Sequence, residues 1–186
     1  MDKLRRLLFV LLMILYAAGV FIGTQKEVKA PNQAEIYQFL ESGVREYDTA
    51  VSSSVKTAFF ENAKLLLMLV AGSLFKPLIW ILGVAMLIKG YFSGFSVMAA
   101  LRLYGVKGVM LCISNFLSAA ILIPAAAYYG SINANALLRG GEKREYYRIF
   151  FAATIFLASI FCADALIKGA MSPIFVKWAA KLLSGA

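Results

Sequence analysis

The residues of this chain best suited to chemistry are charged side chains that lie inside long apolar runs. Asp164 and Lys168 stand four residues apart in one such run, and Lys89 lies within another. Residues four apart share one face of a helix, so Asp164 and Lys168 can neutralise each other. A charge at the centre of a bilayer costs about 2.5–3.5 kcal/mol, so a charge that stays there needs a partner or a function. These three are the candidate intramembrane polar residues, and a structural role and a functional one both stay open for them.

A second polar group, Glu61, Asn62 and Lys64, stands near the start of a different apolar run. Glu61 and Lys64 are three residues apart, which also places them on one helix face. Because they lie near the end of the run, their flexible side chains can reach the lipid headgroups. We interpret this group as interfacial.

The chain lacks the residue combinations that most enzymes use. It contains no histidine, which excludes Ser-His and Cys-His catalytic pairs and metal sites built from His and Cys. Its two cysteines, Cys112 and Cys162, lie in apolar stretches, as small hydrophobic residues do. Asp164 has no second acid nearby for acid-base catalysis, and neither a phosphate-binding loop nor a nucleophile elbow is present. We expect a protein without enzymatic activity, cofactor or metal.

The elements that must position these residues are membrane-spanning helices. Of the 186 residues, 61% are hydrophobic and 16% charged, and the mean hydropathy is +0.77. A span takes roughly 20 apolar residues, so the chain has room for about five, which predicts an all-α, polytopic transmembrane bundle with amphipathic interfacial segments. The net charge of +9 is dispersed among the apolar runs, which favours contact with membrane lipid over nucleic acid.

The chain divides into three parts, and the first two differ sharply in polarity. Residues 1–23 form a basic start followed by an apolar run, which predicts an uncleaved first helix with a cytoplasmic N-terminus; a cleavable signal is the alternative. Residues 24–57 form the largest polar region and are expected outside the cytoplasm. Within 34–55, apolar residues recur at helical spacing, so this segment is predicted to be an amphipathic helix. It lies on the membrane, docks on a partner or packs on its own bundle.

The third part, residues 58–186, is predicted to hold four spans and an amphipathic C-terminal tail. The expected spans are 58–74, a run from 78 to 88, 109–129 and 149–170. Residues 90–101 continue the third helix, re-enter the membrane or lie at the interface; the pattern does not decide. The basic residues of the 131–148 loop favour the cytoplasm, so the C-terminus is predicted to lie outside.

Four residues are expected to shape the packing of these helices. Gly90 and Gly94 have the four-residue spacing that lets two helices approach closely. Pro124 lies inside the fourth span and removes one backbone hydrogen bond, which predicts a kink or a break there. Pro173 follows Ser172 and is expected to end the fifth span, so that 174–186 lies at the interface as an amphipathic tail.

Several short motifs resemble those of the stage II sporulation protein M family, small membrane proteins of about five spans. Phe59-Phe60-Glu61-Asn62 is similar to the family's Phe-x-x-Asn at the start of the second span, and Lys89-Gly90 with Gly94 is similar to its Asn-Gly with a later Gly. Residues 165–173, from Ala165-Leu166-Ile167-Lys168 to Ser172-Pro173, resemble a family ending in which an acid precedes Ser/Thr-Pro. Here Lys168 occupies the acidic position, and Asp164 lies one turn earlier.

The resemblance implies a non-enzymatic protein of the sporulating cell membrane. Members of that family act in engulfment, where they anchor or recruit membrane-anchored peptidoglycan hydrolases during peptidoglycan remodelling. On this hypothesis 34–55 and the outer ends of the spans form a scaffold's docking surface. The rival hypothesis is a transporter subunit, similar to an ABC-type permease, in which Lys89, Asp164 and Lys168 line a path. A membrane enzyme acting on lipid is a weaker third, and assembly with a second copy or another chain stays open.

Overall fold

The computed structural model describes residues 3–25, 51–104, 106–139 and 143–184, with side chains placed in most of these ranges. The described residues form helices and contain no strand, which confirms the all-α bundle. Five helices are long and apolar enough to cross a membrane, as in a multi-pass membrane protein. The elements are α1 (Lys3–Gln25), α3 (Val51–Leu74), the 3₁₀ turn η1 (Lys76–Leu78), α4 (Ile79–Tyr104), α5 (Val106–Arg139) and α6 (Lys143–Ser184).

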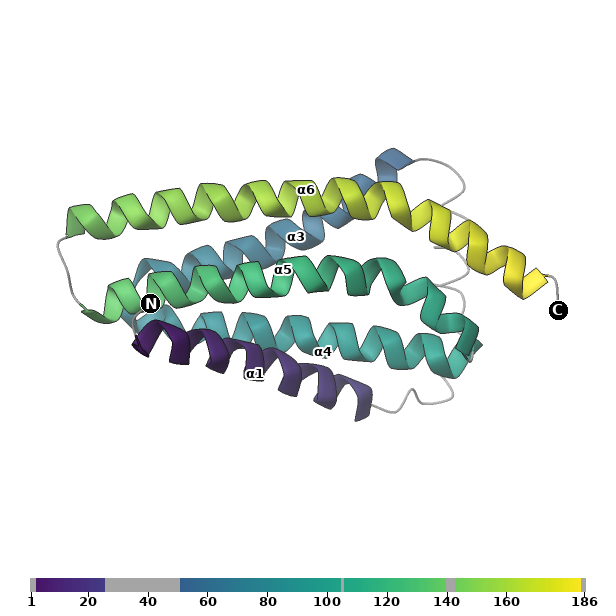
Figure 1. Ribbon diagram of the computed structural model, residues 1–186, viewed down its shortest axis with the longest axis horizontal. Helices are drawn as coiled ribbons and strands as arrows, with labels where there is room; N and C mark the ends of the chain where they lie inside the picture. The colour runs from purple at the N-terminus through teal and green to yellow at the C-terminus, as the bar shows by residue number, and fades with distance from the viewer. Residues whose placement is uncertain (1–2, 26–50, 105, 140–142, 185–186) are drawn as a thin grey trace.

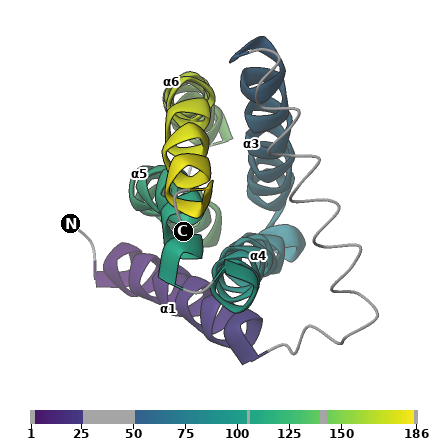
Figure 2. The same cartoon turned by 90° about the vertical axis from the view of Figure 1, so that its right-hand side faces the viewer.

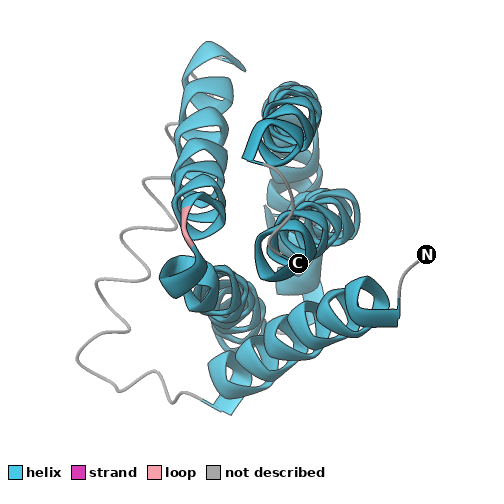
Figure 3. Cartoon of the chain, turned by 90° about the vertical axis from the view of Figure 1, so that its left-hand side faces the viewer, coloured by secondary structure: helices cyan, strands magenta, loops and turns pink. Residues whose placement is uncertain are grey.

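The helices run up and down the long axis of the molecule, each antiparallel to the next in sequence (Figure 1). As a result α1, α4 and α6 run one way, and α3 and α5 run the other. α1 lies against α4, α3 lies against α6, and α5 packs on α1, α4 and α6 (Figure 2). The N-terminus, η1 and the α5–α6 connection share one end of the bundle, which faces the viewer in Figure 3. We call it the N-terminal end, and the other the distal end.

The bundle has an apolar interior and an apolar exterior. Leu69, Leu82 and Leu122 are completely or almost completely buried, whereas Leu67 and Ile155 are about two-thirds exposed. In a protein surrounded by water, such a surface would associate or aggregate, but lipid chains solvate it. The exposed residues therefore fit a bundle whose outer face meets hydrocarbon.

Several helices are longer than the apolar runs that predicted them. α4 is continuous, so residues 90–101 extend the third helix rather than re-entering the membrane. α5 contains Pro124 without a break and continues to Arg139, so the first half of the expected 131–148 loop is helical. Likewise α6 continues through Pro173 to Ser184, and the expected end at Ser172 is wrong. Proline removes only one backbone bond, and in a membrane the neighbouring helical bonds are retained because lipid offers no replacement.

The boundary between the second and third helices agrees with the prediction, because the Phe75-Lys76-Pro77 turn joins α3 to α4 through η1. Most of the polar segment 24–57, including nearly all of the expected amphipathic helix, lies outside the described residues. The amphipathic character of 174–186 is likewise untested, because side chains beyond residue 170 are not described.

Candidate functional site

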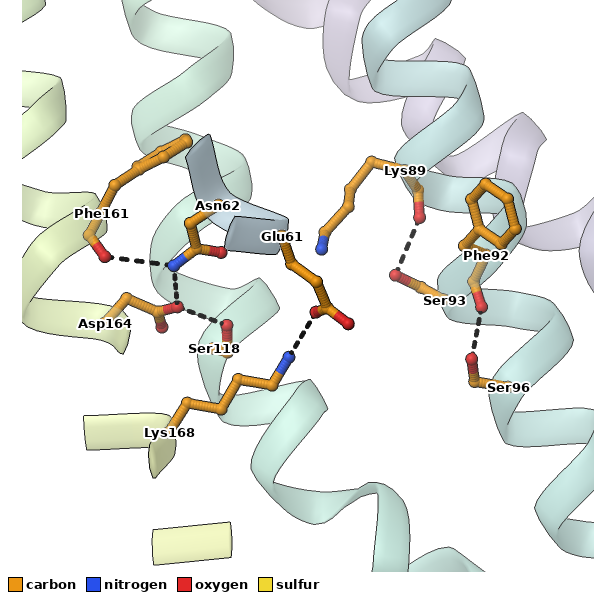
Figure 4. A network of polar contacts seen from close by, with 10 residues as sticks. All are labelled: Glu61, Asn62, Lys89, Phe92, Ser93, Ser96, Ser118, Phe161, Asp164 and Lys168. Atoms are coloured by element: carbon orange, nitrogen blue, oxygen red, sulfur yellow. Dashed lines mark hydrogen bonds and ion pairs between the residues drawn. The ribbon is translucent and has the colours of Figure 1, made fainter. Parts of the chain in front are cut away.

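The charged residues predicted within the membrane meet in one place, between α3, α4, α5 and α6 (Figure 4). α3 contributes two adjacent side chains, α4 and α5 one each, and α6 two that lie a turn apart. We call this group the polar cluster; its members are Glu61, Asn62, Lys89, Ser118, Asp164 and Lys168.

Asp164 is the buried centre of the cluster, with a side chain 2% exposed. Its Oδ2 accepts hydrogen bonds from Asn62 Nδ2 at 3.0 Å and from Ser118 Oγ at 2.9 Å. The same Asn62 amide nitrogen donates to the carbonyl oxygen of Phe161 at 3.1 Å. One carboxylate thus joins three helices, and both donors are themselves buried. A buried acid that accepts bonds from fixed donors has a strong structural role, because losing it leaves those donors unpaired.

Glu61 and Lys168 form an ion pair at the edge of the cluster, with 3.0 Å between Lys168 Nζ and Glu61 Oε2. The side chain of Glu61 is 50% exposed and that of Lys168 is 16% exposed, so the pair is only partly shielded. It links α3 to α6. Together with Asp164, it gives these helices two polar connections one turn apart.

These pairings differ from those that helical spacing predicts. Asp164 and Lys168 share a face of α6, but the structure bonds each of them to a residue of another helix. Glu61 pairs across the bundle, while Lys64 is exposed and has no ion pair among the described residues. The interpretation of Glu61 as merely interfacial is therefore too simple, because it belongs to the cluster. Helical spacing shows which residues share a face, but not what faces them.

Lys89 completes the cluster from α4. Its side chain is half-buried and extends toward Glu61 (Figure 4). Its ammonium group interacts electrostatically with the charges of Glu61, Asp164 and Lys168. It has no hydrogen-bond acceptor among the described residues. With all groups ionised, two ammonium groups face two carboxylates, so the cluster is neutral as a whole. Charge balance of this kind is what allows ionisable groups to remain between helices in a membrane.

The predicted close packing at Gly90 and Gly94 occurs against α1. There it meets a second pair with the same spacing, Gly19 and Gly23, and α1 and α4 run in parallel (Figure 1). A Cβ atom at any of the four glycines would collide with a backbone carbonyl oxygen of the facing helix, namely that of Leu87, Tyr91, Tyr16 or Val20. We call this contact the glycine seam. Gly19 and Gly23 were not among the predicted packing residues, although their four-residue spacing is the same signal.

Further polar contacts lie toward the N-terminal end, where the sequence analysis expected a loop. The Tyr146 hydroxyl donates to the carbonyl oxygen of Ser73, and the hydroxyls of Tyr129 and Thr154 are 3.0 Å apart. Asn133 is fully buried and donates to the Tyr129 carbonyl oxygen at 3.1 Å. The first two contacts join α3 and α5 to the first part of α6, and the Asn133 bond lies within α5.

The polar contacts of the cluster are hydrogen bonds and an ion pair that connect one helix to another. Among the described side chains, no three His, Cys, Asp or Glu residues gather as a metal site would require. The polar cluster can hold helices together and can exchange protons or ion-pair partners. No protein-family model, curated protein or solved structure matches the chain.

Proposed function

We propose that this protein is a non-enzymatic scaffold of the cell membrane that anchors or recruits membrane-bound partners. The observation that carries the proposal is that five of the six members of the polar cluster, all except Lys89, are bonded to one another. Asp164 is bonded to Asn62 and Ser118, and Glu61 is paired with Lys168. Buried polar groups used in this way fix helices relative to one another. A bundle with fixed helices presents a constant surface to a partner.

The partners that we propose are membrane-anchored peptidoglycan hydrolases at the septal or engulfing membrane of a sporulating cell. This step rests on the resemblance to the stage II sporulation protein M family through the motifs around Asn62, Lys89 and Lys168. All three motifs supply members of the polar cluster, namely Asn62 from α3, Lys89 from α4 and Lys168 from α6.

We further propose that the N-terminal end of the bundle is cytoplasmic. Basic residues flank the helices there and follow the usual bias of cytoplasmic loops: Lys3, Arg5, Arg6, Lys76, Arg139, Lys143, Arg144 and Arg148. On this orientation the α4–α5 turn, the start of α3 and the C-terminus are outside, where the cell wall lies. The distal end then carries the docking surface.

Site-specific photo-crosslinking in the producing cell tests the proposal. A crosslinking residue at Lys56 or Arg102 samples the distal end, and positions within 34–55 sample the polar segment. The matched control places the same residue at Lys76 or Arg144, which are also exposed but lie at the other end. We expect wall hydrolases among the products of the distal positions and not of the control positions. Capture of a cytoplasmic ATPase from Arg144, without hydrolases from the distal end, would instead support a permease subunit.

One observation favours that second candidate, a transporter subunit. Lys89 extends into the cluster without a hydrogen-bond acceptor among the described side chains, as a group that engages a transported ion would. The test is solute flux in reconstituted vesicles, comparing the wild type with a variant carrying Asp164→Asn and Lys168→Gln. Loss of a measurable flux in this variant, with partner recruitment intact, would overturn the scaffold proposal.

A further inference from the structure

Arg5 is held in a defined position at the N-terminal end of the bundle. Its Nη2 donates a hydrogen bond to the Tyr128 hydroxyl at 2.9 Å, and its guanidinium carbon lies 4.8 Å from the centre of the Tyr128 ring. Arg5 comes from the first turn and a half of α1, and Tyr128 comes from α5. The contact therefore fixes a cation at the junction of two helices rather than on a freely moving side chain.

The held guanidinium keeps unused hydrogen-bonding capacity. A guanidinium has five N–H donors, and among the described residues one of them has an acceptor, the Tyr128 hydroxyl. The Nε donor is buried without an acceptor among the described residues. Arg5 as a whole is half-buried, and its hydrogen bond to Tyr128 lies at the exposed surface. A planar, partly desolvated guanidinium is the side chain best suited to a phosphate group.

The surroundings of Arg5 are strongly basic. Other exposed cations lie at the same end of the bundle, and Glu145 is the only acidic side chain described there. These cations come from the helix ends and from η1: Lys3, Arg6, Lys76, Arg139, Arg144 and Arg148. The field at this end therefore attracts anions, whatever side of the membrane it faces.

Exposed aromatic residues place this end at the level of the lipid headgroups. Trp80 is 64% exposed, Tyr147 is 47% exposed and Tyr128 is 43% exposed. Trp and Tyr rings of this kind concentrate at the boundary between hydrocarbon and water. Arg5, which Tyr128 holds, lies in the first turn of α1, where the candidate span Lys3–Gln25 begins, so the guanidinium lies at the level of the lipid phosphates.

We propose that Arg5 and Tyr128 form the centre of a binding site for the phosphodiester headgroup of an anionic phospholipid. The phosphate oxygens accept from the guanidinium, and the surrounding cations attract the net negative charge of the lipid. Basic sites between transmembrane helices bind anionic headgroups in this way. The inference does not depend on the proposed scaffold function or on the orientation of the chain.

Native mass spectrometry of the full-length protein in detergent tests the site. The probes are phosphatidylglycerol, which is anionic, and phosphatidylcholine, which has a phosphodiester but no net charge. We expect the wild type to retain phosphatidylglycerol at least tenfold better. Arg5→Gln should weaken binding of phosphatidylglycerol about fivefold, the effect of one basic residue at a membrane surface. Arg5→Lys should lose part of this affinity, because an ammonium group keeps the charge without the planar donor set.

Arg102→Gln is the matched control, because it removes one exposed arginine charge near the end of a helix at the distal end. It should change binding less than twofold. An equal loss in Arg5→Gln and Arg102→Gln would show that only net charge matters, and would overturn the site. Equal retention of the two lipids by the wild type would overturn it as well, as would displacement of the lipid by millimolar inorganic phosphate. If Arg5→Gln lowers the melting temperature, Arg5→Lys is compared with Arg102→Lys instead. A greater loss of phosphatidylglycerol binding in Arg5→Lys supports the site, and an equal loss in the two variants overturns it.

Discussion

The glycine seam and the polar cluster attach helices of the same bundle by opposite means. At the seam, α1 and α4 approach so closely that Gly19 and Gly90 have no room for a side chain. At the cluster, α3, α5 and α6 are joined by side chains that reach across, from Asn62 and Ser118 to Asp164. Lipid is as apolar as the helix surfaces, so hydrophobic burial does not drive either contact. Shape drives the first, and hydrogen bonding drives the second.

α4 takes part in both contacts, through neighbouring residues. Gly90 faces α1 at the seam, while Lys89 extends toward Glu61 in the cluster (Figure 4). Adjacent residues of a helix point about 100° apart, so one helix can serve two interfaces at the same depth. The comparison teaches that the seam should be sensitive to added volume and indifferent to charge, whereas the cluster should be sensitive to lost polarity.

The largest effect is expected for Gly90→Ala. The new Cβ would collide with the Tyr16 carbonyl oxygen, and a backbone atom cannot move aside without separating the helices. We expect the free energy of unfolding in mixed micelles to fall by about 2–3 kcal/mol, as in overpacked cores. The matched control is Gly83→Ala in the same helix, where the Cβ would meet only the Cδ1 end of Leu15, at 2.9 Å.

Gly83→Ala should be neutral or slightly stabilising, because the side chain of Leu15 can shift and alanine favours the helix over glycine. Equal destabilisation by the two substitutions would mean that the seam is not special. The same would follow if Gly90→Ala left stability unchanged. Both results are read from a titration with a denaturing detergent, with helix content followed by circular dichroism.

An intermediate effect is expected for Asp164→Ala, which leaves the Asn62 amide and the Ser118 hydroxyl without their shared acceptor. Hydrogen bonds between membrane helices contribute about 0.6 kcal/mol on average and up to about 1.7. Two such bonds predict a loss of about 1–2 kcal/mol in the same titration. Asp164→Asn keeps the volume and one acceptor oxygen, so its loss should be at most half as large.

If Asp164→Ala had the same free energy of unfolding as the wild type, the hydrogen bonds to Asp164 would not stabilise the bundle. A second check uses Asn62→Ala alone and together with Asp164→Ala. Because the two residues share one hydrogen bond, the double variant should cost less than the sum of the single ones. Strict additivity would show that the bond between them contributes nothing.

Much of the fold could be predicted from the sequence because hydropathy and helix length are local properties. The apolar runs gave the number of helices, and Phe75-Lys76-Pro77 gave a turn. The helix ends were misjudged at Pro173 and after Tyr129, because proline and polar residues were taken as boundaries that a membrane helix can pass.

For the candidate site, most of the residues could be predicted from the sequence, but the contacts between them could not. Its charged residues stand out in apolar runs, so Lys89, Asp164 and Lys168 could be found. Asn62 could be found because it lies between the charged residues Glu61 and Lys64. Ser118 could not be found, because a serine in an apolar helix is common and only its contact with Asp164 gives it a role. Which side chains bond to each other depends on how the helices face one another, and the sequence of one helix does not contain that information. The glycine seam is an exception, because Gly19 and Gly23 have the same four-residue spacing as Gly90 and Gly94.

The smallest effect, and the one that best separates the sequence prediction from the structure, concerns the partner of Glu61. Its spacing in the sequence places it on one helix face with Lys64, and the structure pairs it with Lys168 of α6. A double-mutant cycle with Glu61→Gln and Lys168→Gln should give a coupling of about 0.5–1 kcal/mol, modest because Glu61 is half exposed. The control cycle, Glu61→Gln with Lys64→Gln, should give at most about 0.2–0.5 kcal/mol, the usual range for charge pairs on an exposed helix face. A larger coupling to Lys64 than to Lys168 would reverse the assignment. It would leave Asn62, which donates to Asp164 and to the Phe161 carbonyl oxygen, as the polar connection of the cluster between α3 and α6. The contrast with the glycine seam would then rest on a single amide group.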